Sequence, residues 1–142
     1  MTSELNSEKV KKYGLDAGAR VVGIATSKDF GLASEGFKPN DVLPECLSVI
    51  VLGVTFSPEV LNDVAEYTTS RNQYLLKTTD MAKEVAKWIK ADGYKTKVIS
   101  AAGGKWVEGD GRKEQFGYIS LKHAAEICRT VCPYRFWQKM II

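Results

Sequence analysis

Four polar residues near position 120 are the strongest candidates for chemistry in this sequence. Tyr118, Ser120, Lys122 and His123 lie close together, and His123 is the only histidine of the 142-residue chain. Ser120 is a residue type that caps helix starts, where unpaired backbone N–H groups and a positive dipole end attract anions. We therefore predict a binding site at this loop-to-helix junction. The alternative is that Ser120 only caps a helix and that His123 is partly buried without a ligand.

The preceding segment, residues 101–117, is rich in glycine, and consecutive small residues let backbone amides converge on a phosphate. A Walker loop would need a glycine five positions before the Gly104-Lys105 pair, but Ile99 stands there. The segment also lacks a Gly-x-Gly-x-x-Gly pattern that opens a helix, which argues against a dinucleotide fingerprint. We predict a surface loop for these residues.

The three cysteines are the remaining residues with metal or redox chemistry. Cys128, Cys132 and Pro133 match the last part of a bacterial ferredoxin cluster run, but a four-iron cluster needs four thiolates and Cys46 is the only further cysteine. A zinc site that adds His123 would lack the usual knuckle spacing. The sequence therefore predicts neither a cluster nor a metal site within the chain. An odd number of cysteines fits a reducing compartment without disulfides.

Charge and hydropathy narrow the class of protein. The net charge is +3, and residues 95–142 hold 9 basic and 4 acidic side chains. This bias suits a phosphate-bearing cofactor or a nucleic-acid backbone, but no arginine-rich run with interleaved aromatic residues is present, and a solvated basic face is the favoured explanation. No segment has the roughly 18 apolar residues of a membrane span, and the N-terminus lacks the apolar core of a secretory signal. We predict a cytoplasmic protein that does not enter a membrane.

Hydrophobic periodicity predicts one domain built from alternating helices and strands. The run 48–55 is apolar without alternation, which indicates a strand covered on both faces. Gly18 and Gly93 follow apolar helical patterns and are expected to end them. The other predicted elements are a helix at 3–17, a strand at 19–26, an irregular excursion at 27–47, a short helix at 58–65, a long helix at 70–92, a strand at 95–100 and a helix after Ser120. This order predicts an α/β (α+β) sandwich with helices packed on a small mixed sheet.

Several short blocks of this sequence occur in the same order in a known family. Residues 17–19 read Ala-Gly-Ala, residues 22–25 read Val-Gly-Ile-Ala, Leu-Pro at 43–44 leads into Ser-Val-Ile-Val-Leu-Gly-Val at 48–54, and residues 120–125 read Ser-Leu-Lys-His-Ala-Ala. In these blocks the chain resembles the N-terminal domain of the epoxyqueuosine reductase-like iron–sulfur proteins, which are similar in their core to cobalamin-dependent reductive dehalogenases.

The resemblance implies a fold, a cofactor and partners. Residues 1–127 would form a cobalamin-binding, nitroreductase-like domain of an oxidoreductase. Ser120, Lys122 and His123 would contact polar groups of the corrin or a phosphate. Tyr118 would be the proton donor, since related dehalogenases use a tyrosine. In the family a ferredoxin-like domain with two four-iron clusters feeds electrons to the cobalt, and the epoxyqueuosine branch acts on a tRNA base.

The last residues depart from the family pattern. Where the family continues into Ala-Gly-Leu-Gly and Gly-Lys-Asn, residues 126–133 read Glu-Ile-Cys-Arg-Thr-Val-Cys-Pro, and no ferredoxin-like half follows. We predict that residues 128–142 are an atypical tail from a frameshift or truncation, and that its apolar residues pack on the domain or across a homodimer. The expected function is an oxidoreductase-family domain that lacks its clusters and is inactive alone. The alternatives are a non-catalytic binding or interaction module of the same fold, or a flavin-binding domain.

Overall fold

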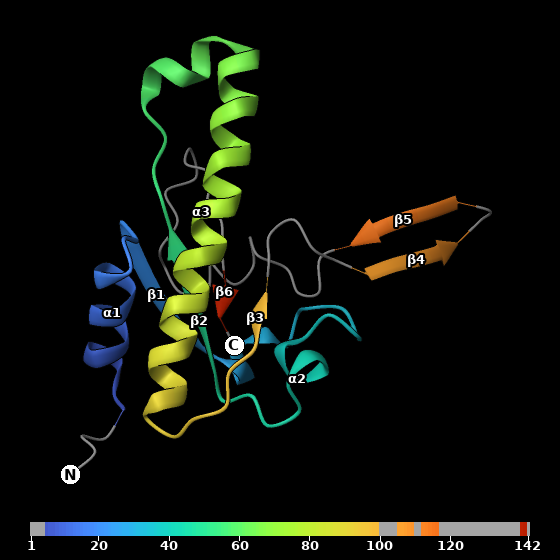
Figure 1. The fold of residues 1–142 in the computed structure, drawn as a ribbon. Helices are drawn as coiled ribbons and strands as arrows, with labels where there is room; N and C mark the ends of the chain where they lie inside the picture. The colour runs from blue at the N-terminus through green and yellow to red at the C-terminus, as the bar shows by residue number, and fades with distance from the viewer. Residues whose placement is uncertain (1–4, 100–104, 110–111, 117–139, 142) are drawn as a thin grey trace.

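The computed structural model describes residues 5–99, 105–109, 112–116 and 140–141 (Figure 1). The elements are α1 (Ser7–Asp16), β1 (Val21–Thr26), the 3-10 helix η1 (Ser27–Phe30), α2 (Pro39–Val42), β2 (Ser48–Gly53), the 3-10 helix η2 (Pro58–Asn62), α3 (Val64–Ala91), β3 (Val98–Ile99), β4 (Lys105–Gly109), β5 (Arg112–Phe116) and β6 (Met140–Ile141). Helices cover a four-stranded sheet, so the predicted α+β class is confirmed.

The sheet has the order β1-β2-β6-β3, and every ladder in the described residues is antiparallel. The prediction of a mixed sheet is therefore wrong for this part of the chain. Strands β1 and β2 pair along their full lengths, from Val21 opposite Gly53 to Thr26 opposite Ser48. The connection between them, residues 27–47, contains only short helices and returns the chain beside β1 instead of crossing over the sheet.

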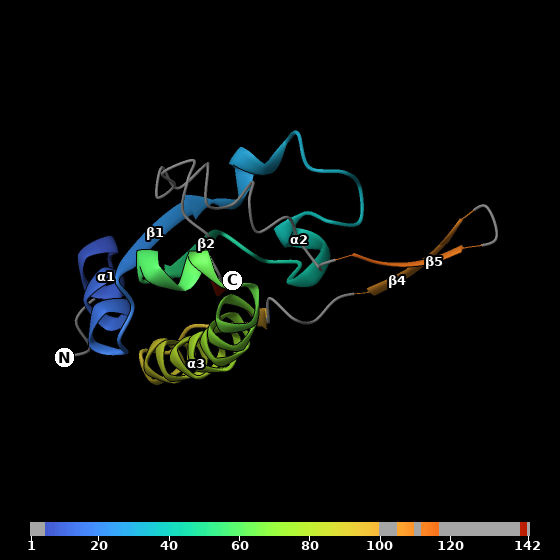
Figure 2. The ribbon, with the colours of Figure 1, turned by 90° about the horizontal axis from the view of Figure 1, so that it is seen from above.

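Strand β2 is buried from Val49 to Gly53, as its unbroken apolar run predicts. Ile50 and Leu52 belong to the core beneath α1 and α3, whereas Val49 and Val51 belong to a second core that includes Phe30. Figure 2 shows α3 on one side of β1 and β2 and the segment that follows β1 on the other. Covered on both faces, β2 is the centre of the fold.

Glycines end the two long helices as predicted. Gly18 (φ 105) and Gly93 (φ 95) adopt left-handed backbone conformations just after α1 and α3. After α1, the N–H of Gly18 donates to the carbonyl of Leu15 (3.0 Å) and the N–H of Ala19 to that of Gly14 (3.1 Å). This pair of bonds is the Schellman motif, which glycine favours because it has no Cβ.

Helix α3 begins earlier than the sequence pattern predicts, at Val64 instead of residue 70. The carboxylate of Asp63 accepts hydrogen bonds from the backbone N–H groups of Ala65 (2.8 Å) and Glu66 (3.0 Å), and so caps the helix there. The short helix predicted at 58–65 is consequently reduced to η2. The spacing of apolar residues in 70–92 predicts one buried helix face, and this face is confirmed by the buried residues of α3, which are Thr78, Met81, Ala82, Val85, Ala86 and Ile89.

The glycine-rich segment contains a hairpin where a loop was predicted. Strands β4 and β5 pair from Lys105 opposite Phe116 to Gly109 opposite Arg112, and Figures 1 and 2 show them extending away from the sheet and helices. Counting glycines favoured a loop, but the two residues between the strands are Asp110 and Gly111, a pair typical of tight hairpins.

The described end of the chain lies inside the main sheet. In β6, Ile141 pairs with Ile50 of β2 and with Val98 of β3, so β6 is hydrogen-bonded on both sides. These two residues thus pair within the sheet of their own domain, and the packing of the rest of the apolar tail stays a prediction. The homodimer contact and the domain boundary after residue 127 stay predictions. Among the described helices, none combines the length and the apolar composition needed to cross a membrane.

A polar cluster joins α1 to the end of α3. The Lys9 ammonium lies 2.9 Å from the Asp92 carboxylate, and the Tyr13 hydroxyl donates to the same carboxylate at 2.7 Å. The Tyr13 and Trp88 rings lie beside it, with centroids 5.5 Å apart. The hydrogen bonds from Lys9 and then Tyr13 hold the pKa of Asp92 below its ordinary value of 3.8, and the bond to Asp92 raises the pKa of Lys9 above 10.5.

This cluster predicts a pH-dependent contribution to stability. A lowered carboxylate pKa stabilises the fold above pH 3.8 and stops doing so as the pH falls through the folded-state pKa. A raised lysine pKa stabilises below pH 10.5 and is lost as the pH rises through its folded-state value. We expect Asp92→Ala to lower the unfolding free energy most between these limits, and the difference from wild type to shrink in acid, as measured by urea unfolding across pH.

A matched control is Asp16→Ala, which removes an exposed i,i+4 partner of Lys12 on the same helix. Such exposed pairs contribute little, so this variant should stay close to wild type at every pH. If the difference in unfolding free energy between wild type and Asp92→Ala does not change with pH, the cluster stabilises the fold by packing alone.

Candidate functional site

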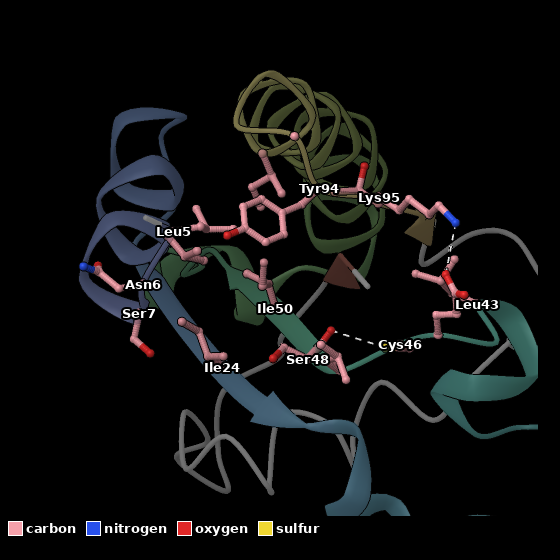
Figure 3. A pocket seen from close by; sticks show the side chains of 16 residues that line it. Leu5, Asn6, Ser7, Ile24, Leu43, Cys46, Ser48, Ile50, Tyr94 and Lys95 are labelled. Carbon is pink, nitrogen blue, oxygen red and sulfur yellow. Dashed lines mark hydrogen bonds and ion pairs between the residues drawn. The ribbon is translucent and has the colours of Figure 1, made fainter. Parts of the chain in front are cut away.

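The described residues contain a cavity of about 610 Å³ between the start of α1, the start of β2 and the segment after α3 (Figure 3). This volume lies in the range of pockets that bind small molecules. The residues that line it are Leu5, Asn6, Ser7, Val10, Ile24, Leu43, Glu45, Cys46, Leu47, Ser48, Ile50, Ile89, Gly93, Tyr94, Lys95 and Thr96. The cavity is our candidate functional site.

The two long walls of the cavity differ in character. Ile24 and Ile50, on neighbouring strands, form an apolar wall on the sheet side. Figure 3 shows the Tyr94 ring on the opposite, α3 side, with Leu5 at one end. Tyr94 is 46% exposed, which is high for a large aromatic residue that lines a cavity. An exposed ring opposite aliphatic side chains is suited to hold a flat apolar ligand.

The end of α3 determines where Tyr94 lies. The N–H of Gly93 donates to the carbonyl of Lys90 (2.9 Å) and the N–H of Tyr94 to that of Ile89 (3.3 Å). These bonds form a second Schellman motif, in which the residue after the glycine turns back toward the helix. Ile89 and Tyr94 accordingly both line the cavity.

Some polar side chains that line the cavity have hydrogen-bond or ion-pair partners within the protein, and one buried side chain has none. Lys95 and Glu45 form an exposed ion pair at 3.0 Å, and the Asn6 side chain accepts from the N–H of Lys9 at 2.9 Å. The Thr96 hydroxyl is different, because it is buried and is the one such side-chain oxygen of the described residues without a hydrogen-bond partner. An unpaired buried hydroxyl costs about 1–3 kcal/mol, which a polar ligand atom could recover.

Cys46 lines the cavity with a buried thiol. Its side chain is buried and unpaired with another cysteine, and its Sγ donates to the carbonyl of Ser48 at 3.4 Å. Burial raises the pKa of this thiol to about 11, so the nucleophilic thiolate is scarce near neutral pH. Glu45 and Lys95 are paired with each other. The residues that line the cavity therefore offer stacking and hydrogen bonding to a ligand instead of acid–base chemistry.

The site residues predicted from the sequence, Tyr118, Ser120, Lys122 and His123, all lie outside the described residues, as do Cys128 and Cys132. Their proximity to one another therefore stays a prediction. Within the described ranges there is no cluster of three or more histidine, cysteine, aspartate or glutamate side chains that could hold a metal.

Sequence reasoning did not single out Tyr94 or Thr96. A usable signal existed, because an apolar residue directly after a helix-ending glycine is typical of the Schellman motif and is directed back toward the helix. No comparable signal marks Ser48 or Thr96, whose role depends on which strands and helices meet around them.

Comparisons with known proteins give no relative for this chain: no protein-family model, no curated protein and no solved structure matches it.

Proposed function

We propose that this chain is a cobalamin-binding domain of an oxidoreductase, similar to the N-terminal domain of the epoxyqueuosine reductase-like proteins, without iron–sulfur clusters of its own. The observation that carries the proposal is the set of sequence blocks in the family's order. The first blocks fall at the end of α1 and in β1, and the next leads into β2. These strands are neighbours in an α+β sheet, which is compatible with a nitroreductase-like sandwich.

In this proposal, Ser120, Lys122 and His123 hold polar groups of the corrin or a phosphate, and Tyr118 supplies a proton to the substrate. The described cavity, at about 610 Å³, is smaller than a whole cobalamin, so these four residues and not the cavity support the cofactor assignment. Bound cobalamin would supply the redox chemistry. Electrons would then come from a separate ferredoxin-like partner, and a tRNA substrate is proposed on the resemblance alone.

The test is an anaerobic titration of the purified chain with cob(II)alamin, followed by gel filtration and an absorbance spectrum. We expect corrin bands to elute with the wild-type protein. His123→Ala and Lys122→Ala should each weaken binding about tenfold or more, since hydrogen bonds to charged groups contribute roughly 1.5–3 kcal/mol. Lys77→Ala, an exposed lysine of α3, is the matched control.

Folded wild-type protein that retains no corrin bands would contradict the proposal. The same titration with flavin mononucleotide then tests the flavin-binding alternative, which the size of the cavity favours. If neither cofactor binds, the result supports a non-catalytic interaction module.

A further inference from the structure

We infer that the cavity beneath Tyr94 binds a neutral, planar heteroaromatic ring, stacked between the tyrosine and the aliphatic wall of the sheet. The inference uses only residues that line the cavity and so does not depend on the cobalamin proposal. The shared chemistry of its candidate ligands is a flat ring with hydrogen-bonding atoms at its edge, as in a nucleobase or a flavin.

The size of the cavity sets the size of the ring. At about 610 Å³, the cavity lies within the range of pockets that bind small molecules. A nucleoside and the three-ring system of a flavin are both small molecules. A larger ligand would have to project through the open side.

The shape of the cavity favours a flat ligand. Figure 3 shows Ile24, Ile50 and Ser48 on the sheet side and the Tyr94 ring across from them. A planar ring bound in the cavity beside Tyr94 would bury the exposed part of the tyrosine. Aromatic pairs gain energy beyond simple burial when they stack with an offset, which a half-exposed ring permits.

The polar groups favour a neutral ring with hydrogen-bonding atoms at its edge. Glu45 and Lys95, the charged residues among the described wall, are paired with each other. Thr96 lines the cavity and its buried hydroxyl lacks a hydrogen-bond partner, so a polar ligand atom that reaches it would satisfy it. The Ser48 side chain is exposed at the cavity and adds a second hydroxyl.

The experiment titrates the full chain with riboflavin, read by quenching of flavin fluorescence, and with adenosine, read by calorimetry. Neither probe carries a phosphate, so binding does not depend on recognition of an anion. We expect saturable binding of at least one probe. The probe that binds shows whether the cavity takes a flavin ring or a nucleobase. Tyr94→Ala should weaken it about 10- to 100-fold, and Tyr94→Phe should stay within about threefold, because stacking needs the ring and not the hydroxyl.

A blocking variant and a surface control complete the test. Ser48→Trp leaves Tyr94 in place but puts an indole into the cavity from the first residue of β2, and it should abolish binding. Leu32→Ala, a surface change that does not line the cavity, should bind like wild type. Circular dichroism confirms that each variant is folded.

Two outcomes would overturn the inference: folded wild-type protein that binds neither probe at millimolar concentration, or equal affinity in wild type and Tyr94→Ala. Cobalamin uptake is read separately by its own absorbance. Loss of ring binding with corrin bands retained, or the reverse, therefore shows which of the two proposals has failed.

Discussion

Replacement of Leu52 by alanine is expected to lower the free energy of unfolding by about 2–5 kcal/mol, the range measured when a fully buried leucine is truncated. Leu52 is 0% exposed at the centre of β2, in the core that α1 and α3 cover. Its loss removes apolar burial and leaves a cavity that the surrounding strands and helices cannot close, because β2 is held by β1 along its full length. Urea unfolding followed by circular dichroism measures the change.

Leu32→Ala is the matched control for Leu52→Ala, because Leu32 is 93% exposed. The same truncation on the surface should change the unfolding free energy by no more than about 0.5 kcal/mol. Comparable losses in the two variants would contradict the packing described for β2, since the difference between them isolates burial from side-chain type.

Gly14→Ala is expected to lower the unfolding free energy by about 1–3 kcal/mol, although alanine is the better helix former. A Cβ at Gly14 would lie 2.3 Å from Cγ2 of Val22 and 3.0 Å from Cδ2 of Leu52, so α1 would have to move away from β1 and β2. The gain in helix propensity is about 1 kcal/mol, and the overpacking of a buried contact outweighs it.

Two further variants make the Gly14 prediction specific. Gly31→Ala adds a methyl group where no atom lies within 4 Å, at a φ of −58°, and should be nearly neutral. Val22→Ala combined with Gly14→Ala removes the closest obstacle and should recover part of the loss, as a double-mutant cycle. A stabilised Gly14→Ala protein would show that α1 does not approach the sheet as closely as described.

The sequence could predict the elements whose causes are local. The apolar run of β2 indicated a strand buried on both faces, and the two cores that share it confirm this. Gly18 and Gly93 indicated the ends of α1 and α3, because the left-handed conformation at these positions favours a residue without a Cβ. The apolar face of α3 was likewise predicted, since its spacing follows the helical repeat.

Some local signals were present but outweighed by others. Asp63 is a good N-cap, yet the proline five residues earlier favours a separate short helix, so the sequence pattern predicts a start of α3 that is later than the observed one. Asp110-Gly111 is a hairpin signal, yet the number of glycines around it suggested a loop. In the first case the cap at Asp63 sets where the helix begins, and in the second the pairing of β4 with β5 shows strands where composition favours a loop.

Sequence patterns were enough to predict the two long helices, the strands β1 and β2, and the glycines that end α1 and α3, because these features depend on hydrogen bonds and side-chain spacing within a few residues. The three-dimensional structure was needed to show that β1 and β2 pair antiparallel, that β6 from the end of the chain lies between β2 and β3, and that Tyr94 faces Ile24 and Ile50 across a cavity. These features join residues far apart in the chain, and strand order and cavity shape follow from which surfaces pack together, which no local pattern records.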